Sequence, residues 1–244
     1  MCTTCGCEGP DGQAHAPTRE GRRRVSLERS LLERNDAFAR ANRARFAERG
    51  ILALNLVSSP GSGKTSLLTA TLRRLQGRLR VLVIEGDQQT SCDAERIRAT
   101  GAPAVQINTG KGCHLDAHAV GHAAAELDPP EGSVLMIENV GNLVCPAAFD
   151  LGEAHKVVIL SVTEGEDKPL KYPDMFAAAG LMLLNKVDLL PHVDFDVDRC
   201  LDFARQVNPR LTCLHTSART GEGLDAWIGW VEEELRAAVP LGRG

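Results

Sequence analysis

The sequence predicts an α/β fold with a mainly parallel sheet flanked by helices. Short β-rich runs alternate with helical segments from residue 51 onward. Several of these runs are apolar at every position, which is typical of strands covered by helices on both faces. A turn rich in Gly and Ser follows the first run, where sheets of this kind bind phosphates. These observations together predict a nucleotide-binding P-loop domain.

The composition limits the possible function classes. The chain has 244 residues, of which 43% are hydrophobic, with 28 Lys and Arg against 32 Asp and Glu. This near balance of charge argues against a general affinity for nucleic acid. No apolar run approaches the roughly 20 residues that span a bilayer, and the N-terminus lacks the apolar stretch of a signal peptide. We therefore expect a cytoplasmic protein with neither a nucleic-acid nor a membrane partner, whose eight cysteines stay reduced.

The N-terminal part divides into a tail and a helix. Residues 1–25 carry almost no large apolar side chain, so we expect a flexible tail. A helical pattern follows over residues 26–49, with Ser26 as its N-cap and Gly50 at its end. The main domain is then expected to span residues 50–240.

The main domain alternates strands and helices. The last helix, expected at residues 224–239, carries Trp227, Ile228 and Val231 at helical spacing, which indicates a face turned to the core. The strands are expected at residues 51–57, 80–84, 104–107, 134–137, 157–162, 181–184 and 211–214.

The turn after the first strand has the pattern of a P-loop. Backbone N–H groups of such a turn converge on a phosphate at the positive end of the next helix. Lys64 is expected to reach the β- and γ-phosphates, and the Thr65 hydroxyl to hold Mg²⁺. One position departs from the usual pattern, because Ser58 stands where Gly is expected. The candidate phosphate-binding residues are Gly61, Ser62, Gly63, Lys64, Thr65 and Ser66.

A second motif predicts that the base is guanine. Asn185-Lys186-Val187-Asp188 follows the strand expected at 181–184. An Asp carboxylate can accept both the N1–H and the exocyclic amine of guanine, a pair of donors that adenine does not offer. The Asn185 amide would brace the loop, and the Lys186 stem would lie over the base. Ser217 and Ala218, after the last strand, fit the accompanying loop, so the domain is predicted to be a P-loop GTPase that binds GTP.

Acidic residues follow two other strands, at the edge where ligands of such sheets bind. Asp87 is a candidate for a second Mg²⁺ contact, directly or through water. Glu138 and Gly141 occupy the place of the GTPase D-x-x-G segment, with Glu in place of Asp, so the Gly141 N–H is expected to sense the γ-phosphate. Asp93 is either a further Mg²⁺ contact or the N-cap of a helix over residues 94–99.

The N-terminal cysteines suggest a metal site. Cys2, Cys5 and Cys7 lie with a free α-amine in a segment that has no core to join. Three thiolates with an amine suit Ni²⁺, although Zn²⁺ or Cu⁺ would also accept the three sulfurs. A redox-active or adventitious thiol cluster is the alternative.

A second metal site is expected within the domain. Cys113 and His114 precede a helical pattern, and Cys145 lies four residues beyond the Gly141 segment. Two thiolates and an imidazole make most of a nickel or zinc site. His118 and His122 continue the spacing of His114 along a helix, which also permits a purely helical metal site, but we interpret them as surface or interface residues.

Together these motifs resemble the HypB family, the nickel-incorporation GTPases of NiFe-hydrogenase maturation. The resemblance covers nearly the whole chain and includes the Cys-x-x-Cys-Gly-Cys start at residues 2–7. It implies a homodimer that GTP forms or tightens, a high-affinity Ni²⁺ site in the tail, and a weaker Ni²⁺ or Zn²⁺ site in the domain. The implied partners are a HypA-type accessory metallochaperone and the hydrogenase large-subunit precursor. Only His15 lies in the stretch that is His-rich in some relatives, so bulk nickel storage is not expected.

Three other functions remain open. The chain would be a nickel- or zinc-binding scaffold if its nucleotide were purely structural. It would also be a GTPase for another metalloenzyme, such as urease, although the Cys-Pro-His type of metal motif of the urease nickel GTPase is absent. A P-loop kinase is disfavoured by Asn185 and Asp188. No arginine finger or water-positioning Gln is evident, so we expect slow intrinsic hydrolysis.

Overall fold

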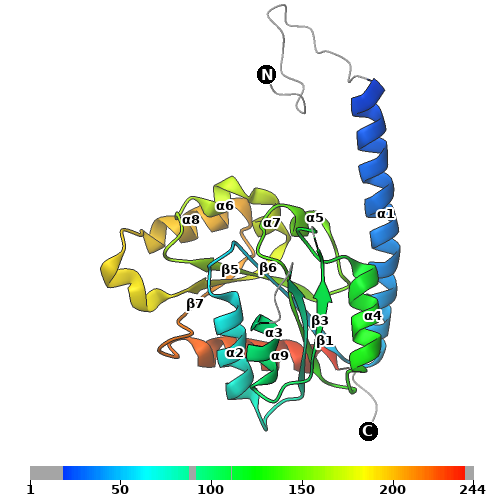
Figure 1. Ribbon diagram of the computed structural model, residues 1–244. Helices are drawn as coiled ribbons and strands as arrows, with labels where there is room; N and C mark the ends of the chain where they lie inside the picture. Colours follow the sequence, from blue (N-terminus) through cyan, green and yellow to red (C-terminus); the bar gives the residue numbers. More distant parts are fainter. Residues whose placement is uncertain (1–18, 88–91, 111, 240–244) are drawn as a thin grey trace, which may run out of the picture.

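A parallel sheet forms the centre of the molecule (Figure 1). The computed structural model describes residues 19–87, 92–110 and 112–239, with only the backbone for 19–29, 87 and 92. Within these residues the sheet has seven strands in the order β3-β2-β4-β1-β5-β6-β7, and every neighbouring pair is parallel. The strands are β1 (Leu52–Ser58), β2 (Val81–Asp87), β3 (Ala104–Asn108), β4 (Val134–Glu138), β5 (His155–Ser161), β6 (Ala179–Asn185) and β7 (Thr212–Thr216).

Helices cover both faces of the sheet. Apolar side chains of α2 and α9 pack on one face, and those of α7, α8, α1 and α4 pack on the other. The longest helix, α1, lies beside α4 and extends beyond the sheet at its N-terminal end (Figure 1). The helices are α1 (Arg19–Glu48), α2 (Lys64–Leu75), α3 (Cys92–Arg98), α4 (Ala117–Leu127), α5 (Cys145–Ala148), α6 (Lys168–Lys171), α7 (Pro173–Ala178), η1 (Val187–His192), α8 (Val197–Val207) and α9 (Leu224–Ala238).

The central strands are buried at almost every position, as their apolar runs predict. On α9, Trp227, Ile228 and Val231 lie in the core, which confirms the interpretation of that stripe. Trp227 also donates from Nε1 to Thr71 Oγ1 at 3.0 Å, so its one polar atom is satisfied inside the core.

Two helix starts differ from the sequence prediction. The helix expected from Ser26 begins seven residues earlier, at Arg19, because the Arg-rich segment before Ser26 favours helix. Asp93 is not an N-cap, since it lies inside α3. The division into a tail at 1–25, a helix at 26–49 and a P-loop GTPase domain at 50–240 stays a prediction.

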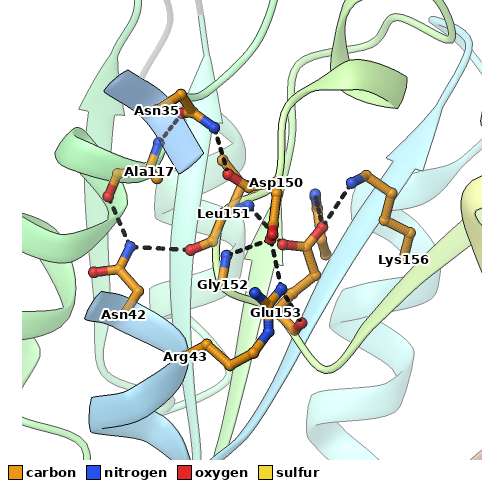
Figure 2. A network of polar contacts seen from close by, with 10 residues as sticks. Asn35, Asn42, Arg43, Ala117, Asp150, Leu151, Gly152, Glu153 and Lys156 are labelled. Atoms are coloured by element: carbon orange, nitrogen blue, oxygen red, sulfur yellow. Dashed lines mark hydrogen bonds and ion pairs between the residues drawn. The ribbon is translucent and has the colours of Figure 1, made fainter. Parts of the chain in front are cut away.

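The C-terminal half of α1 is fastened to the domain by polar side chains (Figure 2). Asn35 donates to the Asp150 carbonyl at 2.7 Å and accepts from the Ala117 N–H at 2.9 Å. Asn42 donates to the carbonyls of Ala117, at 2.7 Å, and Leu151, at 3.0 Å. Both asparagines are more than 90% buried, so these hydrogen bonds have no competition from bulk water. Each joins the start of α4 to the segment that follows α5.

None of the helices described here is both long and apolar enough to cross a lipid bilayer.

Candidate functional site

The turn between β1 and α2 surrounds a cavity of about 590 Å³. β1 brings the chain into the turn, and α2 starts at Lys64, so the positive end of that helix faces the cavity. Gly61 and Gly63 have positive φ angles of 78° and 89°, a region that residues with a Cβ rarely adopt. A Cβ on Gly63 would lie 2.9 Å from the Asn185 side chain, so the turn also requires Gly for space. This geometry suits a phosphate cradle.

Side chains from three separate parts of the sequence meet in this cavity. Glu138 Oε1 accepts from Lys64 Nζ at 2.8 Å and from Thr65 Oγ1 at 2.6 Å. Thr65 Oγ1 also lies 3.2 Å from Asp93 Oδ2. Since β4 lies next to β1 in a parallel sheet, Glu138 at the end of β4 adjoins the P-loop at the end of β1.

The oxygen atoms around Thr65 fit a magnesium ion. Mg²⁺ prefers hydroxyl and carboxylate oxygens and is bound in proteins through one or two carboxylates. Among the described residues, Glu138 Oε2 is buried without a hydrogen-bond partner, so a carboxylate oxygen is available there. Asp93 offers a second carboxylate. The side chain of Asp87 lies outside the described atoms, and its role stays a prediction.

Gly141 lies against the P-loop. A Cβ on Gly141 would lie 3.1 Å from the Pro60 backbone, so any side chain here would crowd the P-loop. Both residues line the cavity. The segment after Glu138 is therefore in direct contact with the turn that would hold the phosphates.

The predicted guanine-binding residues other than Ser217 line a neighbouring cavity of about 330 Å³. Asn185 donates to the Ser62 carbonyl at 3.0 Å, and Lys186 donates to the Gly61 carbonyl at 2.7 Å. Ser217 Oγ donates to Asp188 Oδ1 at 2.6 Å, which fixes the carboxylate. Lys186 itself has a positive φ of 63°. The further residues that line this cavity are Gly63, Ser66, Leu189, Ala218 and Arg219.

Cys113, His114 and Cys145 come together as predicted. Their ligand atoms all lie within 4.8 Å of one another, with Cys113 Sγ 3.0 Å from Cys145 Sγ and 3.5 Å from His114 Nδ1. The hydrogen bond to Cys145, together with burial, raises the pKa of the Cys113 thiol. Burial lowers the pKa of His114, which favours the neutral imidazole that ligates metals. Two soft sulfurs and an imidazole fit Ni²⁺ or Zn²⁺.

The possibility of a purely helical histidine site is wrong. Asp116 caps α4 by accepting from the Ala119 N–H at 2.8 Å, so the helix begins after His114. His118 and His122 lie on α4 and are exposed, as predicted, with their Nε2 atoms 3.2 Å apart. The tail residues Cys2, Cys5 and Cys7 lie outside the described residues.

Sequence reasoning missed several residues near the site. Lys168 donates to Ser59 Oγ of the P-loop at 3.2 Å, and Arg96 lines the phosphate cavity. Asn139 and Asn142 contact the segment that carries Cys113. Asparagine and lysine are common on surfaces, so only their contacts in the fold indicate a role.

Comparison with known proteins identifies the family. A family model described as the CobW/HypB/UreG nucleotide-binding domain matches residues 52–215. A hydrogenase maturation factor HypB from Azotobacter vinelandii is 66% identical over 236 residues, which cover 95% of this chain and 78% of that protein. This chain belongs to the HypB family. The predicted fold class, family and GTPase assignment are thereby confirmed.

Two further HypB proteins support this conclusion. The hydrogenase maturation factor HypB of Escherichia coli K12 is 62% identical over 220 residues, which cover 90% of this chain and 76% of that protein. The crystal structure of HypB from Helicobacter pylori in complex with nickel has a TM-score of 0.78 at 35% identity. It covers 86% of this chain, and this chain covers 99% of it.

Proposed function

We propose that this HypB protein is a GTP-hydrolysing nickel metallochaperone that times the insertion of Ni²⁺ into a NiFe-hydrogenase large-subunit precursor. The observation that carries the proposal is the position of Cys145, one of the candidate metal ligands, on the segment that leaves the phosphate cavity. Glu138 contacts Lys64 and Thr65, and Cys145 follows only seven residues later. A change at the phosphates therefore has a short path to a metal ligand.

The nucleotide roles follow from the cavities. We assign the β- and γ-phosphates to Lys64 and the P-loop, and Mg²⁺ to Thr65 with Glu138, Asp93 and Asp87. The Gly141 N–H is the γ-phosphate sensor. The base roles belong to Asn185, Lys186, Asp188, Ser217 and Ala218.

The metal cargo is assigned to two sites. Cys113, His114 and Cys145 hold Ni²⁺ or Zn²⁺ in the domain, and Cys2, Cys5 and Cys7 hold Ni²⁺ in the tail. The structure of the Helicobacter pylori relative contains nickel, which supports Ni²⁺ as the cargo. We further propose a cytoplasmic homodimer that GTP stabilises and that works with a HypA-type metallochaperone.

Metal affinity in two nucleotide states tests the proposal. A chain whose tail cysteines are replaced by alanine is titrated with Ni²⁺ in the GDP state and in a nonhydrolysable GTP state. The two affinities should differ, and Cys145→Ala should remove the difference, whereas Cys213→Ala, at a half-buried cysteine outside the site, should not. Equal affinities in both states of the starting protein would refute the timing role. A phosphate-release assay separates this enzyme from a scaffold, because a scaffold binds GTP without turnover.

A further inference from the structure

A single segment, residues 139–145, connects the phosphate cavity with the cysteine cluster. It begins after Glu138, which contacts Lys64 and Thr65, and it ends at Cys145. Two asparagines on this segment also contact the other chain segment that carries metal ligands, residues 113–115.

Asn139 joins the end of β4 to the residue after His114. Its Oδ1 accepts from the Leu115 N–H at 3.1 Å and from the Val140 N–H at 2.9 Å. Its Nδ2 donates to Asn55 Oδ1, on β1, at 3.2 Å. Asn139 is 1% exposed, so water cannot replace a broken bond without a rearrangement. A displacement of the end of β4 therefore acts directly on the backbone beside His114.

Asn142 makes the matching contact on the other side of the two candidate ligands Cys113 and His114. Its Nδ2 donates to the Cys113 carbonyl at 3.2 Å, and its Oδ1 accepts from the Val144 N–H at 2.8 Å. One side chain thus connects Cys113 with the residue before Cys145. The two asparagines together hold the backbone on both sides of Cys113 and His114.

At their far ends, the two segments that carry the candidate metal ligands are joined to each other through α1 (Figure 2). Asn35 and Asn42 connect Ala117 with Asp150 and Leu151, beyond the metal ligands on each segment. The segments therefore have a fixed end at α1 and a second end that follows the phosphate cavity. A displacement that enters from the cavity changes the separation of the ligands instead of moving the whole site as one body.

We propose that Asn139 and Asn142 are positioning residues that couple the nucleotide state to the metal site; this inference rests on the proposed function. When GTP and Mg²⁺ bind, Lys64 and Thr65 turn from Glu138 to the phosphate and the ion. Glu138 and the segment behind it then move, and the two asparagines transmit the movement to Cys113 and His114. Because coupling is reciprocal, metal at the site changes GTP affinity by the same factor.

The test uses the full chain with its tail cysteines replaced by alanine, and the variants Asn139→Ala and Asn142→Ala. Asn208→Ala is the matched control, because Asn208 also donates to backbone carbonyls but lies at the end of α8, where it contacts Phe176 and Ala179. The Ni²⁺ dissociation constant is measured for each protein with GDP and with a nonhydrolysable GTP analogue. The electronic spectrum of bound Co²⁺ is recorded in both states as an independent readout of ligand geometry.

The starting protein and Asn208→Ala should show a ratio of the two constants of about fivefold or more, within the usual range of allosteric coupling. Asn142→Ala and Asn139→Ala should bring the ratio to within about twofold of one, with the same Co²⁺ spectrum in both states. A merely structural defect would raise both dissociation constants by the same factor and leave their ratio unchanged. Because Asn139 is buried and its variant can be unstable, Asn142→Ala decides the case.

The possible failures are distinguishable. If the starting protein binds no metal at this site or no GTP, the proposed function is wrong. If it is coupled and Asn142→Ala keeps the full ratio, the proposed function stands and the role of the asparagines is refuted. If it binds both ligands with no coupling, the positioning role is refuted as well.

Discussion

Replacement of Asp188 by Asn should exchange the preferred base from guanine to xanthine. In the proposed site the carboxylate accepts from guanine N1–H and from the exocyclic amine. Ser217 Oγ, which donates to Asp188 Oδ1 at 2.6 Å, holds the carboxylate in place. An amide keeps one acceptor and turns an N–H toward the guanine amine, so one charge-assisted hydrogen bond is lost. Xanthine has a carbonyl at that position, which the amide N–H can satisfy.

The size of the effect follows from that one bond. A hydrogen bond to a charged group contributes up to about 3 kcal/mol, which corresponds to a factor on the order of 100 in the dissociation constant. Competition against a fluorescent guanine nucleotide gives the constants for GTP and xanthosine triphosphate. GTP should weaken by about that factor while the xanthosine analogue strengthens.

A matched control separates base recognition from loss of negative charge. Asp194→Asn removes an exposed carboxylate six residues further along the chain and should leave both constants unchanged. If Asp188→Asn keeps its preference for GTP over xanthosine triphosphate, Asp188 does not contact the base and the assignment of the second cavity is wrong.

Three further predictions concern the lysine and the cysteines. Lys64→Ala should abolish phosphate release and leave tail nickel bound, as radiometric hydrolysis and equilibrium dialysis would show; loss of tail nickel would mean that the two sites share an element. Replacement of Cys2, Cys5 and Cys7 by Ala should remove the tightest Ni²⁺ site and its charge-transfer absorption, with a melting temperature changed by about 2 °C or less, whereas a large decrease would show that these residues pack. Burial raises the pKa of Cys200 to about 12, so iodoacetamide at pH 8 should spare this thiol until denaturant is added; modification in the native state at the rate of a free thiol would contradict its burial.

Much of the fold could be predicted because the signals are local. Apolar runs such as residues 134–137 and 181–184 predict strands by composition alone, and both appear with slightly longer bounds. The meeting of Glu138 with the P-loop was also predictable, since carboxyl ends of parallel strands share one edge. Cys113 and Cys145 were placed together by their ligand chemistry, since two thiolates and an imidazole make most of a metal site, and their sulfurs lie 3.0 Å apart.

The features that were missed depend on tertiary contacts. Asn35 and Asn42 lie on a helix whose sequence pattern shows only an apolar stripe, and their partners are 75 to 115 positions away. Spacing alone left a helical site of His114, His118 and His122 open, because the start of α4 depends on one hydrogen bond from the Ala119 N–H to Asp116. Asn142 has no apolar or charged signature, and its role becomes visible only through the Cys113 carbonyl.

The order of the strands explains the position of the candidate metal site. The P-loop follows β1, the proposed base-binding residues follow β6 and β7, and the segment to Cys145 follows β4, on the opposite side of β1 from β6. Guanine is identical in GTP and GDP, so contacts at β6 and β7 carry no information about hydrolysis. The γ-phosphate and its Mg²⁺ are what change, and they are expected between the P-loop and Glu138. A metal site beside the base would not respond to hydrolysis. A metal site on the segment that follows β4 is connected to the part of the cavity where the γ-phosphate is expected.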